Sequence, residues 1–343
     1  MPFNRYAALD VLRVIAVLGV VAAHFTWSAN WVYDHLGKYP TEAFGAIAQV
    51  SAYGFLGVHL FFVISGAVIS RSAVGRTARG FVIARFLRLM PALLIAVPLS
   101  AALVIVAGGA DVPATLRSIV SNLVLLPSMA NSGWLNPVFW TLVVEASFYG
   151  IVALVLLIWG SDRRVLRRFA WVWLGAIIVL SRVHNDVLDT ILLADWAPFF
   201  IVGILIGTSS SRADRAAACV GMVAAGLLAV ESTLATMDPD GRSVSVIVVL
   251  VTAIIVVVAA SVWWSPMAQI QSRSWAFVGT MTYSLYLFHV IPGRMISGWL
   301  LESNFGVVVS YFVGIAVAVL VSFVVTRYAE PPIRRWMKSA LTL

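Results

Sequence analysis

Charged residues are scarce in this sequence, and their scarcity excludes most classes of soluble protein. Only 11% of the 343 residues are Asp, Glu, Lys or Arg, whereas soluble domains carry about 25%. Hydrophobic residues make up 61%, and they form long runs joined by short connections. We therefore expect an all-α, polytopic membrane protein.

Cysteine and the common catalytic motifs are also nearly or wholly absent. The single cysteine, Cys219, excludes an internal disulfide and lies in an apolar run, where we expect a buried structural thiol. The sequence contains no P-loop, dinucleotide fingerprint or nucleophile elbow. None of the five histidines forms an HExxH pair, so we expect no metal site.

Hydrophobic runs of about 20 residues predict ten transmembrane helices. They lie near residues 7–28, 52–72, 82–107, 138–159, 167–183, 190–208, 216–234, 244–264, 276–299 and 306–327. An eleventh stretch, 115–130, is shorter and contains Asn122 and Pro127, so we interpret it as a re-entrant or interfacial segment on the outer side.

The distribution of basic residues supports this topology. With ten crossings and the N-terminus inside, the inner side holds 18 of the 23 Lys and Arg residues and the outer side holds five. The positive-inside rule therefore places both termini in the cytoplasm. The net charge of +8 is explained by topology, and we infer no nucleic-acid binding from it.

The whole chain, residues 1–343, is expected to form a single integral membrane domain without a fused soluble domain. Its first hydrophobic run is interrupted by Arg13 and has no convincing cleavage site after it. We therefore interpret this run as a retained first span and not as a signal peptide. The expected location is the plasma membrane, which is the inner membrane in bacteria.

Residues 9–25, LDVLRVIAVLGVVAAHF, carry three ionisable groups within this first span. On an α-helix, Arg13 and His24 differ by about 20° in angular position and by roughly 16 Å along the axis, and Asp10 lies within about 60° of both. Charges at membrane depth usually face a bundle interior or an aqueous path. The alternative is a structural Asp10–Arg13 pair with an interfacial histidine.

Two arginines lie at the start of the third predicted span, in the run RFLRLMP at 85–91. Arg85 and Arg88 are three residues apart and so project from one helical face. Together with Arg13 they can hold a cytoplasmic polyphosphate, because a guanidinium group binds phosphate in a bidentate manner. The alternative is that both side chains extend to lipid headgroups.

A carboxylate and two further histidines lie within other predicted spans. Glu145 is roughly 10 Å into the fourth span from its outer end, at a depth comparable to His24 and His59. A carboxylate that accepts a hydrogen bond from an imidazole supports a general base. Glu145 can instead be protonated or paired elsewhere. His289 is interpreted as a structural or tunnel-lining hydrogen-bonding residue.

Aromatic residues gather at the predicted outer side. Trp31 lies in the first outer loop, and Trp134 and Trp140 lie near the outer end of the fourth span beside Asn131 and Asn136. These residues fit either a platform for a carbohydrate acceptor or an interfacial aromatic belt, and the belt is the commoner arrangement.

Six motifs in order resemble the acyltransferase-3 family of integral membrane acyltransferases, which includes bacterial O-antigen and exopolysaccharide O-acetylases. The motifs are LDVLR followed by ten residues and His24, LFFVISGAVIS at 60–70, RFLRLMP at 85–91, FWTLVVEASFY at 139–149, TYSLYLFH at 282–289 and RYAEPPIRR at 327–335. The resemblance spans nearly the whole chain. Three positions depart from the family pattern: Val11 replaces a common glycine, Ala146 a frequent acidic residue, and His59 a frequent aspartate.

The resemblance implies transfer of an acyl group, usually acetyl, from cytoplasmic acyl-CoA to a hydroxyl of an extracytoplasmic or lipid-linked acceptor. By matching motif, Arg13, Arg85 and Arg88 would bind the donor, and His24 would be the catalytic histidine. The expected partners are acyl-CoA, a saccharide or lipid-linked acceptor, and membrane lipids.

The resulting hypothesis places the nucleotide at the inner face, the pantetheine along the stripe from Asp10 to His24, and the thioester at His24. His24 either deprotonates the acceptor or is itself acylated first, and Glu145 orients it or balances its charge. Asp10, His59 and His289 are supporting residues. A secondary transporter could use the same buried charges as a substrate or proton path, and a membrane scaffold would need no charged stripe.

Overall fold

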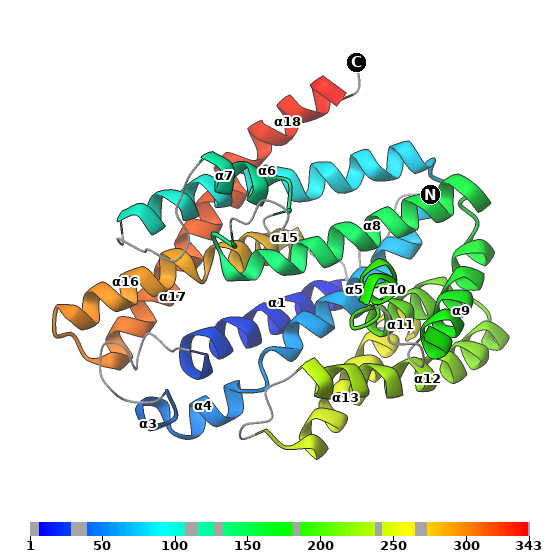
Figure 1. Ribbon diagram of the computed structural model, residues 1–343, viewed down its shortest axis with the longest axis horizontal. Coiled ribbons are helices and arrows are strands. Elements are labelled where there is room, and N and C mark those ends of the chain that lie inside the picture. The colour runs from blue at the N-terminus through cyan, green and yellow to red at the C-terminus, as the bar shows by residue number, and fades with distance from the viewer. Residues whose placement is uncertain are drawn as a thin grey trace. The chain divides into compact units, whose positions relative to one another are not determined.

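The structure is a computed structural model, and almost all of the chain that it describes is helical (Figure 1). It describes residues 7–28, 40–106, 116–126, 133–180, 186–236, 242–264 and 273–341. No strand occurs within these ranges. The all-α prediction is therefore confirmed for the described part of the chain.

Sixteen α-helices and three short helical turns of other types follow one another along these ranges. In chain order they are α1 (Ala7–Ala22), η1 (Ala23–Trp27), α3 (Pro40–Phe44), α4 (Ala46–Ser51), α5 (Leu56–Ala73), α6 (Ala78–Val106), α7 (Leu116–Leu123), η2 (Pro137–Phe139), α8 (Trp140–Trp159), α9 (Arg163–Leu180), α10 (Asp186–Leu192), α11 (Ala197–Thr208), α12 (Arg212–Thr236), α13 (Val244–Trp263), α15 (Arg273–Phe288), α16 (Ile291–Glu302), α17 (Val307–Val324), η3 (Val325–Ala329) and α18 (Glu330–Leu341).

Eight helical segments within the described ranges are long and apolar enough to cross a membrane. They are Ala7–Trp27, Ala46–Ala73, Ala78–Val106, Pro137–Trp159, Val187–Thr208, Arg212–Thr236, Val244–Trp263 and Val307–Leu341. The polytopic membrane bundle is confirmed, and the protein is an integral membrane protein. The placement of both termini in the cytoplasm remains a prediction.

The other two predicted spans have a different form in the structure. The segment predicted at 167–183 falls in α9, whose first six residues include four arginines. The segment predicted at 276–299 consists of two shorter helices, α15 and α16, separated by a turn at His289 and Val290. Pro292 lies in the first turn of α16, where proline is favoured because its missing N–H needs no partner.

Two further predictions concern α7 and α12. The stretch expected to be re-entrant forms the short helix α7, and Asn122 on it is fully buried, bonding to the carbonyls of Ser118 and Gly133. The expected burial of Cys219 is wrong, because this free thiol is exposed on α12. An apolar run therefore marked an exposed position here and not a core.

Contacts between residues divide the chain into two compact units. As far as it is described, the first unit comprises residues up to 16, 56–82 and 144–276. The second unit comprises 17–55, 83–143 and 277–343. The expectation of a single membrane domain remains a prediction, and the two units are treated separately below.

In the first unit, α5 and α11 approach each other closely because both present glycines. A Cβ atom on Gly66 would lie 2.3 Å from the carbonyl oxygen of Phe200, and one on Gly203 would lie 2.2 Å from that of Val63. Small residues allow this backbone approach, which is a common basis of helix association in membranes. Beside this contact, the rings of Phe148 and Phe200 stack with centroids 4.1 Å apart.

In the second unit, α16 and α17 hold the end of the first helix. A Cβ on Gly293 of α16 would lie 2.6 Å from the ring of Phe25 and 3.1 Å from the carbonyl oxygen of Gly314 on α17. The fully buried Phe25 belongs to η1, a single π-helical turn that continues α1. These contacts fix η1, and with it the neighbouring residue His24.

Candidate active site

His24 and His289 meet in the second unit. Nε2 of His289 lies 3.2 Å from Nδ1 of His24, and the ring centroids are 5.0 Å apart. His24 is the second residue of η1, and π-helical turns occur frequently at functional sites. His289 is fully buried at the turn between α15 and α16, and His24 is half-buried.

The backbone around His289 determines which of its nitrogens carries hydrogen. Nδ1 of His289 lies 2.8 Å from the carbonyl oxygen of Tyr286 and 3.2 Å from that of Leu285. A carbonyl oxygen only accepts hydrogen bonds, so we assign the hydrogen to Nδ1. In the neutral ring, Nε2 of His289 then presents a lone pair to His24.

The same reasoning extends to His24. Its Nδ1 faces two acceptors, the carbonyl oxygen of Val20 at 3.0 Å and Nε2 of His289 at 3.2 Å. Nδ1 of His24 must therefore carry hydrogen, and the lone pair of the neutral ring lies on Nε2. Among the described residues, none forms a hydrogen bond with this Nε2. His24 thus offers an available basic nitrogen whose tautomer is set by its surroundings.

Arg294 on α16 holds the carboxyl end of η1. Its Nη2 donates hydrogen bonds to the carbonyl oxygens of His24 at 2.6 Å and Ser28 at 3.0 Å. The last carbonyls of a helix lack partners within it, and an arginine compensates for both this lack and the negative end of the helix dipole. No sequence motif marks Arg294, although it follows His289 by only five residues and Pro292 marks the new helix between them.

Two polar contacts hold the end of α15 that leads to His289. The Nδ2 of Asn136 donates to the carbonyl oxygen of Leu287 at 2.9 Å, and Asn136 is fully buried. The hydroxyl of Thr141 donates to Tyr286 Oη at 3.0 Å. The amide of Asn136 therefore supports the histidine pair from within the protein and is not a surface group for binding a sugar.

The predicted donor-binding arginines Arg85 and Arg88 both lie on α6 in the second unit and are half-buried. The guanidinium carbon of Arg88 lies 4.8 Å from the centroid of the Tyr283 ring. The hydroxyl of Tyr283 donates to the carbonyl oxygen of Leu89 at 3.1 Å, which fixes the ring. An arginine held over an aromatic face can still use its N–H groups for phosphate.

The first unit contains four other predicted site residues. Arg13 forms a 2.7 Å ion pair with the buried Asp10, as the structural interpretation of this pair expected. Glu145 accepts hydrogen bonds from Tyr149 and, at 3.5 Å, from Ser65.

The fourth residue, His59, is buried between aromatic side chains. The rings of Phe199 and Trp196 have centroids 4.5 and 5.7 Å from that of the imidazole. Since His24 belongs to the other unit, its predicted pairing with Glu145 and its shared stripe with Arg13 remain predictions.

The predicted acceptor side is described only in part. Trp31 lies outside the described residues, whereas Trp134 and Trp140 lie in the second unit and are half-buried. Within the part of the chain that the structure describes, no three His, Cys, Asp or Glu side chains are grouped as metal ligands.

Comparison with known proteins supports the chemistry that these groups suggest. A family model described as "Acyltransferase domain" matches residues 6–327. Nodulation protein 10 of Rhizobium leguminosarum bv. viciae is 27% identical over 195 residues, which cover 48% of this chain and 49% of that protein. The match therefore spans about half of the relative's length.

No solved structure matches the chain. The family model nevertheless extends over the first five motifs and both histidines of the pair, and it ends at Arg327, the first residue of RYAEPPIRR. The chain therefore belongs to the acyltransferase-3 family of integral membrane acyltransferases.

Proposed function

We propose that this membrane acyltransferase moves an acyl group, acetyl by default, from cytoplasmic acyl-CoA to a hydroxyl of an extracytoplasmic or lipid-linked acceptor, with a saccharide as the favoured acceptor. The observation that carries the proposal is the histidine pair, in which Nδ1 of His24 faces two acceptors. The opposite nitrogen of a neutral, oriented imidazole is the group that general-base catalysis requires.

In the direct route, Nε2 of His24 removes the proton from the acceptor hydroxyl while its oxygen attacks the thioester carbonyl. The new C–O bond forms, the C–S bond breaks, and the proton on Nε2 passes to the departing CoA thiolate. In the alternative route, Nε2 attacks the thioester carbonyl first, so that a C–N bond forms, the C–S bond breaks and CoA leaves as the thiolate. The acceptor oxygen then attacks the acyl-imidazolium, the C–N bond breaks, and the proton of the hydroxyl passes to the thiolate. Both routes need the lone pair on Nε2, which the contacts of Nδ1 support.

The phosphates of the donor are assigned to Arg85, Arg88 and Arg13. Arg88 supports this role best, because its guanidinium group lies over the ring of Tyr283, which is itself held by a hydrogen bond to the carbonyl oxygen of Leu89. Arg13 would bind phosphate while retaining its bond to Asp10, since a guanidinium group has five N–H donors. Glu145, hydrogen-bonded to Tyr149, is proposed to balance the charge of the imidazolium.

The first experiment separates chemistry from donor binding. Purified His24→Ala in nanodiscs should bind acetyl-CoA as the unaltered protein does, yet transfer no radiolabelled acetyl group from acetyl-CoA to membrane or glycan fractions. General-base catalysis contributes about 10²- to 10⁴-fold. Turnover at the normal rate by a well-folded His24→Ala protein would remove His24 from the mechanism.

The donor site has a matched control within the same part of the chain. Arg85→Ala/Arg88→Ala should abolish binding of acetyl-CoA, whereas Arg76→Ala/Arg79→Ala should not, although it removes two exposed arginines with the same spacing. Equal binding by both variants would reject the donor assignment. Substrate movement without consumption of a thioester would instead favour a secondary transporter.

A further inference from the structure

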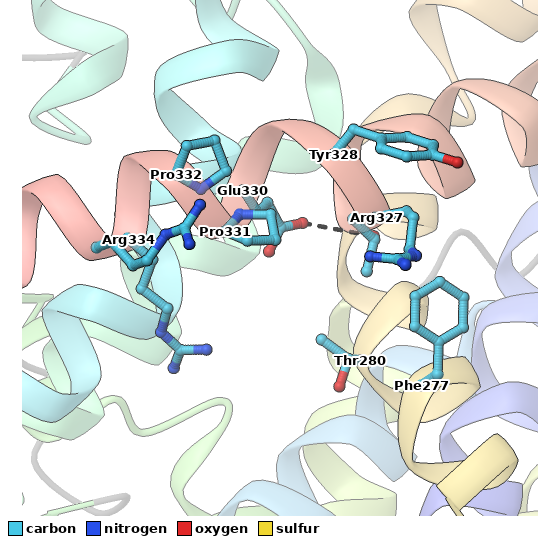
Figure 2. A pocket seen from close by; sticks show the side chains of 10 residues that line it. Phe277, Thr280, Arg327, Tyr328, Glu330, Pro331, Pro332 and Arg334 are labelled. Carbon is cyan, nitrogen blue, oxygen red and sulfur yellow. Dashed lines mark hydrogen bonds between the residues drawn. The ribbon is translucent and has the colours of Figure 1, made fainter.

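A second basic site lies near the carboxyl end of the chain, within the second unit (Figure 2). A pocket of about 600 Å³ is lined by residues of α15, η3 and α18. Arg327 lies on η3, and Arg334 and Arg335 lie on α18. Arg85 and Arg88 are not among the residues that line this pocket.

The one carboxylate that lines the pocket is already bound by hydroxyl groups. Glu330 accepts a hydrogen bond from the buried Ser284 and lies 3.5 Å from the hydroxyl of Thr326, and Thr326 in turn donates to Ser284 at 2.8 Å. The dashed line in Figure 2 marks the contact between Glu330 and Thr326. These two hydroxyls hold Glu330 in place without using a cation.

The three arginines have no acidic partner within the described part of the chain. No ion pair joins Arg327, Arg334 or Arg335 to a described Asp or Glu side chain. Figure 2 shows Arg334 and Arg327 toward opposite ends of the row of side chains, with Glu330 between them. An excess of two positive charges therefore surrounds the pocket.

The chemistry of the lining favours a phosphate ester. Guanidinium groups bind phosphate oxygens in a bidentate manner, and a volume of about 600 Å³ lies within the range of small-molecule sites. The rings of Tyr328 and Phe277 and two prolines, Pro331 and Pro332, supply an apolar wall for the organic part of the ligand. The guanidinium carbon of Arg327 lies 5.5 Å from the centroid of the Tyr328 ring.

We propose that this pocket binds a phosphate ester through Arg327, Arg334 and Arg335. Two sources offer the same chemistry: the headgroup of an anionic phospholipid, or a soluble phosphate compound. The site goes beyond the proposed acyl transfer, because it uses none of the residues assigned to the donor or to the histidine pair.

The test uses the full-length protein with Arg85→Ala/Arg88→Ala as background, so that the proposed donor site does not contribute. Inorganic pyrophosphate, measured by calorimetry in detergent, probes the soluble source. Phosphatidylglycerol retained by the protein from mixed phosphatidylcholine–phosphatidylglycerol nanodiscs, counted by native mass spectrometry, probes the lipid source.

Arg334→Gln/Arg335→Gln should weaken binding of one probe about tenfold or more, as expected for the loss of charge-assisted hydrogen bonds. The matched control is Arg163→Gln/Arg164→Gln, which removes two adjacent, exposed arginines at the start of α9. The probe that responds identifies the source. If the double variant does not fold, Arg335→Gln alone replaces it, and we expect a smaller loss of binding.

Two results would overturn the proposal. The first is an equal loss of binding in the pocket variant and the control, which would show a response to total charge only. The second is the absence of binding of either probe by a folded, monodisperse protein. The variant Arg334→Lys/Arg335→Lys should recover binding only partly, because lysine keeps the charge but lacks the planar fork.

Discussion

At the scale of single residues, His289 holds the imidazole of His24 through the contact between its Nε2 and Nδ1 of His24. His24 and His289 were selected as ionisable groups within apolar runs, and the motifs assigned the catalytic role to His24. A separation of 265 residues carries no local pattern that predicts a 3.2 Å contact. Arg294 was missed for a related reason, because its partners are backbone carbonyls, which every residue has.

The contact predicts that His289 positions His24 and keeps its tautomer. His289→Leu should lower kcat about 10- to 100-fold with little change in the KM for acetyl-CoA, as expected for the loss of a residue that orients another. The pH dependence of the rate should change as well, since Nδ1 of His24 loses an acceptor. Steady-state kinetics across a pH series measures both effects.

His289→Gln provides the conservative control for this prediction. The amide oxygen of glutamine can take the place of Nε2 and accept from His24, so this variant should recover part of the lost kcat. If His289→Leu and His289→Gln lose activity equally, with unaltered pH profiles, His289 contributes only to packing.

Arg294 makes a prediction about stability. Arg294→Gln removes the charged donor that binds the carbonyls of His24 and Ser28, and should lower the free energy of unfolding by about 2 kcal/mol. Thermal unfolding in detergent measures the loss, and faster amide exchange in residues 24–28 should accompany it. An unchanged unfolding temperature together with unchanged exchange would contradict this role.

At the scale of helices, the sequence predicted most elements correctly but not where they change geometry. Runs of apolar residues located the helices α5, α6, α8 and α13 within a few residues. The same runs passed through the turn at His289 and the π-helical turn η1 without interruption, and the last run ended within the π-helical turn η3. Hydrophobic runs report length and burial, whereas such breaks depend on tertiary contacts of the backbone.

The close approach of α5 and α11 predicts a position that tolerates no side chain. Gly203→Ala should destabilise the first unit by about 1–3 kcal/mol, because its Cβ would lie 2.2 Å from a backbone oxygen that cannot move alone. Gly150→Ala on α8 is the control, since no atom lies within 4 Å of its added Cβ. Thermal unfolding followed by size-exclusion chromatography should give a lower unfolding temperature for Gly203→Ala than for Gly150→Ala. The reverse order would contradict the close approach of the two helices.

At the scale of the whole molecule, composition determined the membrane class and charge distribution determined the expected topology. Ten spans were predicted and eight helical segments in the described ranges meet the length and composition of a span. The difference arises where arginines occupy the start of α9 and where α15 and α16 are too short individually.

The topology makes a prediction that chemical labelling can check. In a Cys219→Ser background, Ser339→Cys on α18 should react with a membrane-impermeant maleimide only after the cells are permeabilised. Ser303→Cys, in the turn after α16, should react in intact cells. Both serines are exposed and bond only to backbone carbonyls of their own helix, so the two variants are matched. Labelling of Ser339→Cys in intact cells would reverse the proposed orientation.

In the histidine pair, Nδ1 of His289 faces backbone carbonyl oxygens, and this limits where a proton can move. Nδ1 of His289 donates to the carbonyls of Leu285 and Tyr286, which cannot pass a proton onward. In the proposed mechanism, a proton taken up by Nε2 of His24 therefore leaves by the same nitrogen, to the thiolate released from the donor. Acyl transfer then exchanges no proton with either side of the membrane, so we expect its rate to be independent of an imposed pH gradient.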